Sequence, residues 1–217
     1  MQTMNKRMFL TLAIGATLAG RLAMGSAFAA TGGKPVHLRG TIDGFSGNTL
    51  RLTLRDGTKT SAVLNAQSHV SWILPAKASD IEKGSYIGTA AMPQKDGTLR
   101  ALEIQVFPPS MRGVGEGFHP FDVAPHSTMT NGTIGAMTNG TVDSIISAKG
   151  RTLVVTYKGG KKTVFVPDGV PFITYAPADR SALTPGAHVI VLGLRAADGT
   201  VTARNVGVGK DGLVPPM

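Results

Sequence analysis

The chain has 217 residues, with 22 lysines and arginines against 13 aspartates and glutamates, and its formal net charge at pH 7 is +9. It contains no cysteine, which excludes disulfides, thiolate metal sites and a cysteine nucleophile. The basic residues do not concentrate on one predicted element, as a nucleic-acid-binding surface requires, so we expect no nucleic-acid partner.

The first 29 residues have the pattern of an export signal peptide. Lys6 and Arg7 precede an apolar run over 8–19, and the small residues at 27–29 suit a signal peptidase. The run of about a dozen residues is too short to span a bilayer of ~30 Å, so we expect no stable membrane span after cleavage and a periplasmic or secreted protein. Lys6 also stands where a twin-arginine signal has its first arginine, which leaves the secretory and twin-arginine routes open.

The rest of the chain contains one pattern of motifs twice. Residues 38–108 and 139–209 match at an offset near 102. The matching segments are 40–43 with 140–143, 49–52 with 152–155, 75–76 with 177–178, and 96–98 with 198–200. A repeat of this length indicates two copies of one domain.

Each copy alternates apolar and polar residues as strands with one buried face do. Leu50, Leu52 and Leu54 share one face of a strand, and Asp-Gly pairs mark the turns. Residues 79–84 have a capping-box pattern that closes on glycine, which favours one helical turn. Three strands, a helical turn and two more strands is the order of an OB-like Greek-key barrel.

We therefore predict an all-β protein made of two tandem OB-like five-stranded barrels. The first barrel covers 30–108 and the second 139–210, followed by a C-terminal tail over 211–217, of which we expect 214–217 to be frayed. An irregular glycine-rich central segment over 109–138 joins the barrels. A single two-sheet sandwich is the alternative fold.

Three motifs recur in both copies: Gly-Thr-Ile/Val-Asp, Gly-x-Thr-Leu-x-Leu/Val and Asp-Gly-Thr-x-x-Ala-x-x-Ile/Val. This pattern resembles the exported bacterial β-barrel domains catalogued as domain of unknown function 5666, in two copies. The resemblance implies the barrel fold and export, and it names no catalytic or ligand-binding residue.

The central segment carries an unusual density of polar and aromatic side chains for a glycine-rich loop. We predict Arg112, Glu116, Phe118 and Asp122 as ligand-binding residues. Burying the Phe118 ring would contribute on the order of 2 kcal/mol, so we expect this segment to pack on a barrel. The phrase Met-Thr-Asn-Gly-Thr-Ile at 129–134 recurs almost unchanged at 137–142, which favours a local hairpin or an added strand.

A metal site is the alternative interpretation of this segment. His119, His126 and Met129 offer imidazole and thioether donors, a set that favours copper over zinc. The spacing matches no established ligand motif, and methionine also fills gaps in cores. Ser127 follows His126, yet no nucleophile-elbow pattern surrounds it, so we predict that the chain is not an enzyme.

These observations predict a non-catalytic periplasmic binding or scaffolding protein without a cofactor. Its partner would be an envelope component, a protein or a polysaccharide, that contacts the central segment. Periplasmic copper binding through the central segment is the alternative function.

Overall fold

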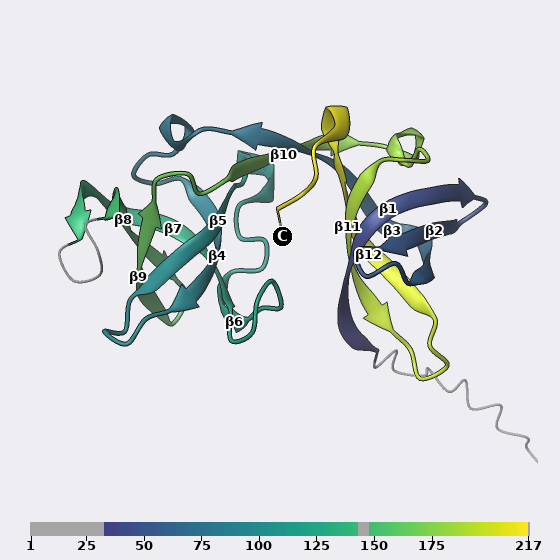
Figure 1. Cartoon of the computed structure of the whole chain (residues 1–217), viewed down its shortest axis with the longest axis horizontal. Helices are drawn as coiled ribbons and strands as arrows, with labels where there is room; N and C mark the ends of the chain where they lie inside the picture. Colours follow the sequence, from purple (N-terminus) through teal and green to yellow (C-terminus); the bar gives the residue numbers. More distant parts are fainter. Residues whose placement is uncertain (1–32, 143–147, 217) are drawn as a thin grey trace, which may run out of the picture. The chain divides into compact units, whose positions relative to one another are not determined.

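The computed structural model describes residues 33–142 and 148–216, and the expected signal peptide lies outside these ranges. The described chain is all-β, with four 3-10 turns of three residues each. No helix in these ranges is long and apolar enough to cross a membrane. The strands (Figure 1) are β1 (Lys34–Ser46), β2 (Thr49–Leu54), β3 (Lys59–Ala76), β4 (Tyr86–Pro93), β5 (Leu99–Val106), β6 (Gly117–Pro120), β7 (Thr128–Val142), β8 (Ala148–Tyr157), β9 (Gly160–Pro167), β10 (Phe172–Ala178), β11 (His188–Arg195) and β12 (Val201–Gly209).

Five of the strands form a closed barrel, which we call ring A. β1 pairs with β2 and β11, β2 pairs with β3, and β12 pairs with both β11 and β3. The β3–β12 pairing is parallel and the other four are antiparallel. The core of this ring includes Ile42, Leu50, Leu52, Leu64 and Val191, all of them buried. Closure leaves the ring without the free edges of an open sheet.

Five other strands form a second closed cycle of pairings, which we call ring B. β4 pairs with β5 and β7, and β8 pairs with β7 and β9. A short parallel pairing of β5 with β9 closes the cycle, with Leu99 opposite Val164 and Arg100 opposite Phe165. A separate cluster of buried aliphatic side chains, Leu153 among them, belongs to this ring.

Each ring combines strands from both copies of the repeat. Ring A takes β1 to β3 from the first copy and β11 and β12 from the second, and ring B takes β4 and β5 from the first copy and β7 to β9 from the second. The expectation that 30–108 and 139–210 each close on themselves is therefore corrected: the two copies exchange their last hairpins. β3 continues to Ala76, and its residues 70–76 pair with β10, so the hairpin that follows β3 lies in ring B.

The 3-10 turn that precedes each exchanged hairpin contacts the same ring as that hairpin. Arg180, in η3 (Arg180–Ala182), donates from Nη1 to Oδ1 of Asn48 at 2.8 Å. At the equivalent place in ring B, Arg151 donates from Nη1 to the carbonyl of Ala78, in η1 (Ala78–Asp80), at 2.7 Å. In both rings a turn from one copy is therefore hydrogen-bonded to the first two strands of the other copy.

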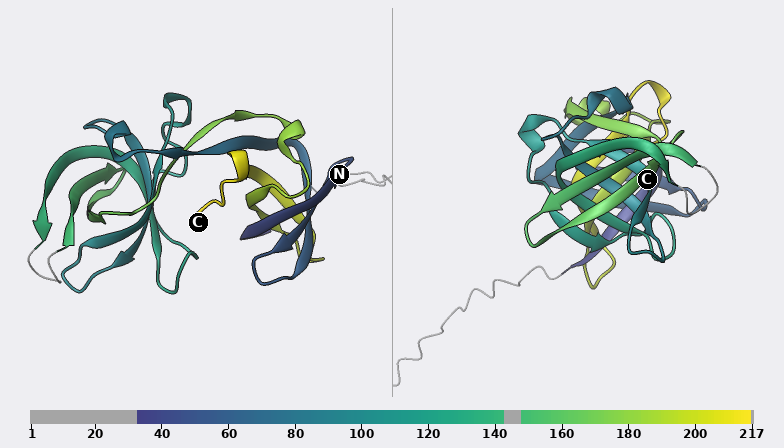
Figure 2. Two further views of the ribbon diagram at one scale, coloured as in Figure 1. Left: turned by 45° about the horizontal axis from the view of Figure 1, so that its top comes forward. Right: turned by 90° about the vertical axis from the view of Figure 1, so that its left-hand side faces the viewer.

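β3 and β10 are the strands that pass from one ring to the other (Figure 2). Residues 70–76 of β3 pair antiparallel with residues 172–178 of β10, and Ile73 lies opposite Tyr175. These two residues are equivalent under the 102-residue offset, so the pairing has the self-complementary form of an interface between two identical units. Ile73 also belongs to a third buried cluster, to which β4, β7, β10 and β11 contribute.

Two expectations about the connecting parts are wrong. The repeated phrase does not form a hairpin, because 129–134 and 137–142 lie in the single strand β7, whose register with β8 shifts at Gly135. The central segment is also less irregular than expected, since it contains β6 and much of β7.

The C-terminal tail is held in place over its described residues. Arg55 donates from Nη2 to the carbonyl of Pro215 at 2.5 Å, and Pro215 is buried. Leu213 packs against the third cluster. The expectation of a frayed end is therefore wrong for residues 214–216, and residue 217 lies outside the described part.

Candidate functional site

The side chain of Arg112 fixes the start of the central segment to ring B. Nη2 donates to the carbonyl of Gly84 at 2.7 Å, and Nη1 donates to Oγ1 of Thr133 at 3.2 Å. The guanidinium lies 5.9 Å from the centre of the Tyr86 ring, within the range of a cation–π contact. Arg112 is thus anchored and remains exposed on one side.

Glu116 and Phe118 meet the β8–β9 turn. Oε1 of Glu116 accepts a hydrogen bond from the backbone N–H of Lys158 at 2.8 Å. Nζ of Lys162 lies 4.2 Å from the centre of the Phe118 ring, which remains 37% exposed. Three of the four predicted ligand residues, Arg112, Glu116 and Phe118, therefore lie on ring B, the last two beside the β8–β9 turn.

Asp122, the fourth predicted residue, lies elsewhere. Its Oδ1 accepts from Nη2 of Arg39 at 2.6 Å and lies 2.8 Å from Nδ1 of His37. The preceding ring of Phe121 is 5.2 Å from the ring of His37 and 5.7 Å from the guanidinium of Arg39. Because His37 and Arg39 belong to β1, Asp122 joins the central segment to ring A.

The charge state of Asp122 follows from these contacts. Partial burial alone would raise the pKa of the carboxyl group, but the hydrogen bonds and charges of Arg39 and His37 outweigh it and lower the pKa to about 2. The carboxylate is therefore ionised throughout the physiological range.

The predicted copper ligands do not form a compact group of donors. His119 lies opposite Met129 in the β6–β7 ladder, but Met129 is buried in the third cluster and His119 is exposed. His126 occupies an exposed turn with a φ of 63°. In the part of the chain that the structure describes, no three or more His, Cys, Asp or Glu side chains could jointly hold a metal ion. Copper binding stays a prediction.

Ser127 has a structural position. Its hydroxyl donates to the carbonyl of Phe121 at 2.9 Å and accepts from the backbone N–H of Ala124 at 3.1 Å. The residue is 2% exposed. These bonds close the turn that presents Asp122.

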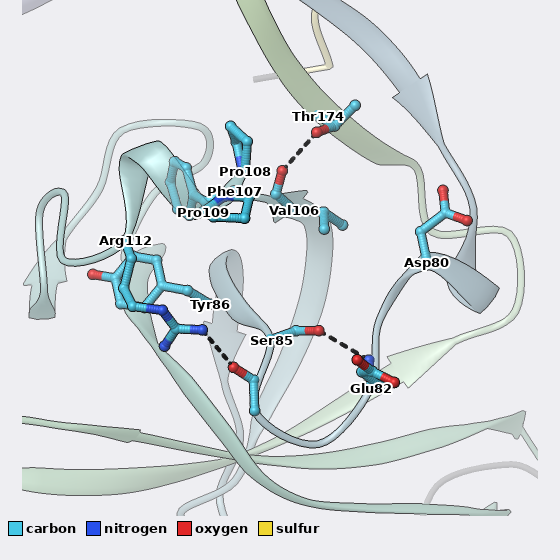
Figure 3. Close-up of a pocket in the computed structure, with 11 residues that line it drawn as sticks. Asp80, Glu82, Ser85, Tyr86, Val106, Phe107, Pro108, Pro109, Arg112 and Thr174 are labelled. Carbon is cyan, nitrogen blue, oxygen red and sulfur yellow. Dashed lines mark hydrogen bonds between the residues drawn. The ribbon is translucent and has the colours of Figure 1, made fainter.

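The central segment forms one wall of two cavities. The first has a volume of about 370 Å³ and is lined by Arg112, Tyr86 and Phe107, with Asp80 on the opposite side (Figure 3). The second has a volume of about 390 Å³ and lies between the start of the central segment and the crossing strands β3 and β10. Met111, Val114, His69, Tyr175 and Ala176 are among its lining residues.

An aromatic ladder of Tyr86, Phe107 and Tyr175 links the linings of the two cavities, and sequence reasoning missed it. The rings of Tyr86 and Phe107 lie 5.5 Å apart, and the rings of Phe107 and Tyr175 stack at 5.5 Å and 10°. The Tyr175 hydroxyl donates to Oε1 of Gln105 at 2.9 Å. Burial, together with the charge of Glu103, raises the pKa of Tyr175 above its usual value. Isolated aromatic residues in strand patterns resemble ordinary core positions, so only the pairing of β10 with β5 brings these rings together.

Comparison of the chain with protein-family models, curated proteins and solved structures found no match. The resemblance to the domain of unknown function 5666 therefore stays a prediction that depends on the quoted motifs.

Proposed function

We propose that the chain is a non-catalytic binding protein, periplasmic or secreted, and that the central segment forms its contact surface with an envelope component. We further assign each ring to the OB-like class. In both rings the repeat strands follow the order first, second, third, fifth, fourth, and the third and fifth strands pair in parallel. This order supports the assignment, with the last hairpins exchanged between copies.

The cavity between the central segment and the crossing strands carries the proposal. Its volume of about 390 Å³ lies in the range of roughly 300–1,000 Å³ typical of ligand pockets. Met111, Val114 and Ala176 supply apolar walls, whereas His69 and Asn205 supply hydrogen-bonding groups. Such a lining suits a ligand that has an apolar body and a few polar groups at its edge.

The bonding of the titratable groups supports a role without catalysis. The carboxylates of Glu116 and Asp122 accept hydrogen bonds that hold the segment in place, and the Ser127 hydroxyl closes a turn. A general base or nucleophile needs a free, activated partner within hydrogen-bond reach. None of these three groups is arranged in that way.

Calorimetric titration of the purified protein with soluble peptidoglycan fragments tests the proposal. We expect saturable binding that Ala176→Trp weakens about tenfold or more, because an indole fills the cavity and displaces the ligand. Val114→Glu, at a residue that is 47% exposed, tests the same wall without burying a large side chain. Ala196→Trp, in the exposed β11–β12 turn, is the matched control.

The proposal predicts that both cavity variants lose affinity while the control keeps it. Absence of saturable binding by the wild-type protein would contradict the proposal. Equal affinity of the wild type and both cavity variants would remove the cavity as the contact site.

A further inference from the structure

The exposed Phe118 ring on ring B contacts Lys162, and the β8–β9 turn that precedes Lys162 carries further lysines. We call this surface the basic rim and define it as Arg112, Phe118, Lys158, Lys161 and Lys162. Three of its lysines fall within the five residues Lys-Gly-Gly-Lys-Lys of the β8–β9 turn. The turn bends at Gly159, whose φ is +98°.

The strand register places Lys161 and Arg112 on the same face of ring B. Thr133 lies opposite Thr156, and Thr156 lies opposite Lys161. Residues directly opposite in antiparallel strands point to the same side of a sheet. Arg112 is bonded to Thr133, so its guanidinium and the base of Lys161 stand two strand spacings apart, about 10 Å.

The rim retains its positive charge because acidic partners are scarce around it. In residues 33–142 and 148–216, the structure shows salt bridges of Asp122 with His37 and Arg39, and neither involves a residue of the rim. Glu116 accepts from the backbone of Lys158 rather than from its ammonium group, and Asp80 and Glu82 line the same cavity as Arg112. Arg112 stays exposed while it holds Gly84 and Thr133, and the lysines of the β8–β9 turn present the remaining positive charge to an external anion.

The aromatic content of the rim decides between classes of polyanion. Single-stranded nucleic acid is held by several exposed rings on which successive bases stack. Phe118 is the one aromatic side chain among the large hydrophobic residues exposed in the described chain, and Lys162 covers one face of its ring. Stable attachment to a membrane requires apolar insertion as well as charge, and the rim offers little apolar surface. Charges spaced along a chain, without stacking bases, fit the rim better.

We propose that the basic rim binds an acidic polysaccharide chain, whose carboxylate or sulfate groups pair with Arg112 and the lysines of the β8–β9 turn. The proposal rests on the proposed function in placing the contact at the central segment, and it adds the chemical class of the ligand. Lys162 lies on the Phe118 ring and is thereby pre-positioned, which reduces the side-chain entropy lost on binding.

Dextran sulfate and neutral dextran of matched length are suitable probes. We compare the wild type with a variant that combines Lys158→Gln, Lys161→Gln and Lys162→Gln. The matched control combines Lys34→Gln, Lys59→Gln and Lys210→Gln, which removes the same charge from three exposed lysines outside the rim. Circular dichroism establishes that both variants fold.

We expect the wild type to bind dextran sulfate and not dextran, with an affinity that falls as salt rises. The rim variant is expected to bind about tenfold or more weakly, with a salt dependence reduced by about three ionic contacts. The control variant should stay within about threefold of the wild type, because exposed charges beyond a Debye length are screened.

Three results would overturn the proposal. An equal loss in the control variant would show attraction by net charge alone. Equal binding of neutral dextran would exclude charge as the basis of recognition. Tighter binding of an oligothymidylate strand or of phosphatidylglycerol vesicles than of dextran sulfate would assign the rim to another class of partner.

The cavity variant Ala176→Trp separates this proposal from the proposed function. It lies on β10, outside the rim, and should bind dextran sulfate as the wild type does. Loss of peptidoglycan-fragment binding with retained dextran sulfate binding would therefore leave the rim proposal intact, and the reverse pattern would leave the cavity proposal intact.

Discussion

Replacement of Asp122 by alanine is expected to lower the free energy of unfolding by about 1 kcal/mol at pH 7. The carboxylate is bonded to Arg39 and His37 of β1, and its pKa lies at about 2 instead of 3.8. This difference in pKa corresponds to about 2.4 kcal/mol as an upper limit. The Asp122 side chain is 52% exposed, so solvent screening reduces the contribution to about 1 kcal/mol.

The pH dependence has a defined sign. The pKa of Asp122 is lower in the folded protein than in the unfolded chain, so its stabilisation is complete above pH 3.8 and is lost as the pH falls toward 2. Thermal unfolding followed by circular dichroism should show a Tm about 2–4 °C below the wild type for Asp122→Ala at pH 7. The gap should narrow as the pH is lowered from 4 to about 2.

Asp168→Ala, in the exposed turn after β9, controls for the loss of a surface carboxylate. An unchanged Tm of Asp122→Ala at pH 7 would refute the reasoning. So would a gap that stays constant from neutral to acid pH, because the effect would then come from packing and not from the ionised group.

Three further predictions test other parts of the structure. A variant with Val63→Cys and Thr202→Cys should form a disulfide within one chain, because these residues are neighbours in the parallel β3–β12 pairing. A variant with Val63→Cys and Arg100→Cys should stay reduced. Mass spectrometry after oxidation shows which pair has formed the disulfide. Gly40→Ala should lower the free energy of unfolding by about 2–3 kcal/mol in urea titrations, since an added Cβ would lie 2.2 Å from a backbone oxygen of β2. In ultraviolet titration the Tyr175 phenol should stay protonated well above pH 10, its ordinary pKa, because burial and the charge of Glu103 raise its pKa, and the stability it contributes should be lost as the pH rises further.

Each of these predictions has a matched comparison. The chain has no cysteine of its own, so an Arg100 disulfide would mean that each copy closes on itself. Gly135→Ala should cost less than about 1 kcal/mol, because its Cβ would approach the rotatable Oγ1 of Thr156 at 3.1 Å; an equal cost would argue against the backbone clash at Gly40. Tyr175→Phe should leave the ultraviolet titration below pH 10 unchanged. Loss of one titrating phenol below pH 10 in this variant would contradict the raised pKa of Tyr175.

The strands could be predicted from sequence because their signals are local. Leu50 and Leu52 alternate with polar residues and are both buried in ring A. Thr98 and Thr200, at equivalent places in the two copies, each donate a backbone N–H at 2.9 Å to the aspartate two residues earlier. These short-range patterns depend on neighbouring residues alone.

The partners of the strands could not be predicted in the same way. Both copies carry the same final hairpin, so β4–β5 and β11–β12 offer equivalent partners to either ring. The third strand of the first copy runs to Ala76, whereas that of the second copy stops at Pro167 and resumes at Phe172, and both copies exchange their hairpins. The sequence therefore indicates two small barrels but does not indicate which hairpin completes each of them.

The candidate site also combines contacts between residues that are close in sequence with contacts between residues that are far apart. Arg112, Glu116 and Phe118 lie within seven residues of one another in sequence and reach the same part of ring B. Asp122 pairs with His37 at a separation of 85 residues, which no local pattern encodes. Lys162 lies beside Phe118 through a contact between the central segment and β9, which no local pattern encodes either.

The exchange of hairpins also affects the order in which the protein can fold during synthesis. All five strands of ring B have been synthesised once Pro167 has been added, whereas ring A is complete only after β12, which ends at Gly209. β1 to β3 are the first strands to emerge and the last to obtain all their partners. Their unpaired edges stay open to aggregation throughout this interval, so a nascent chain stalled between the two points would need a chaperone more than the finished protein does.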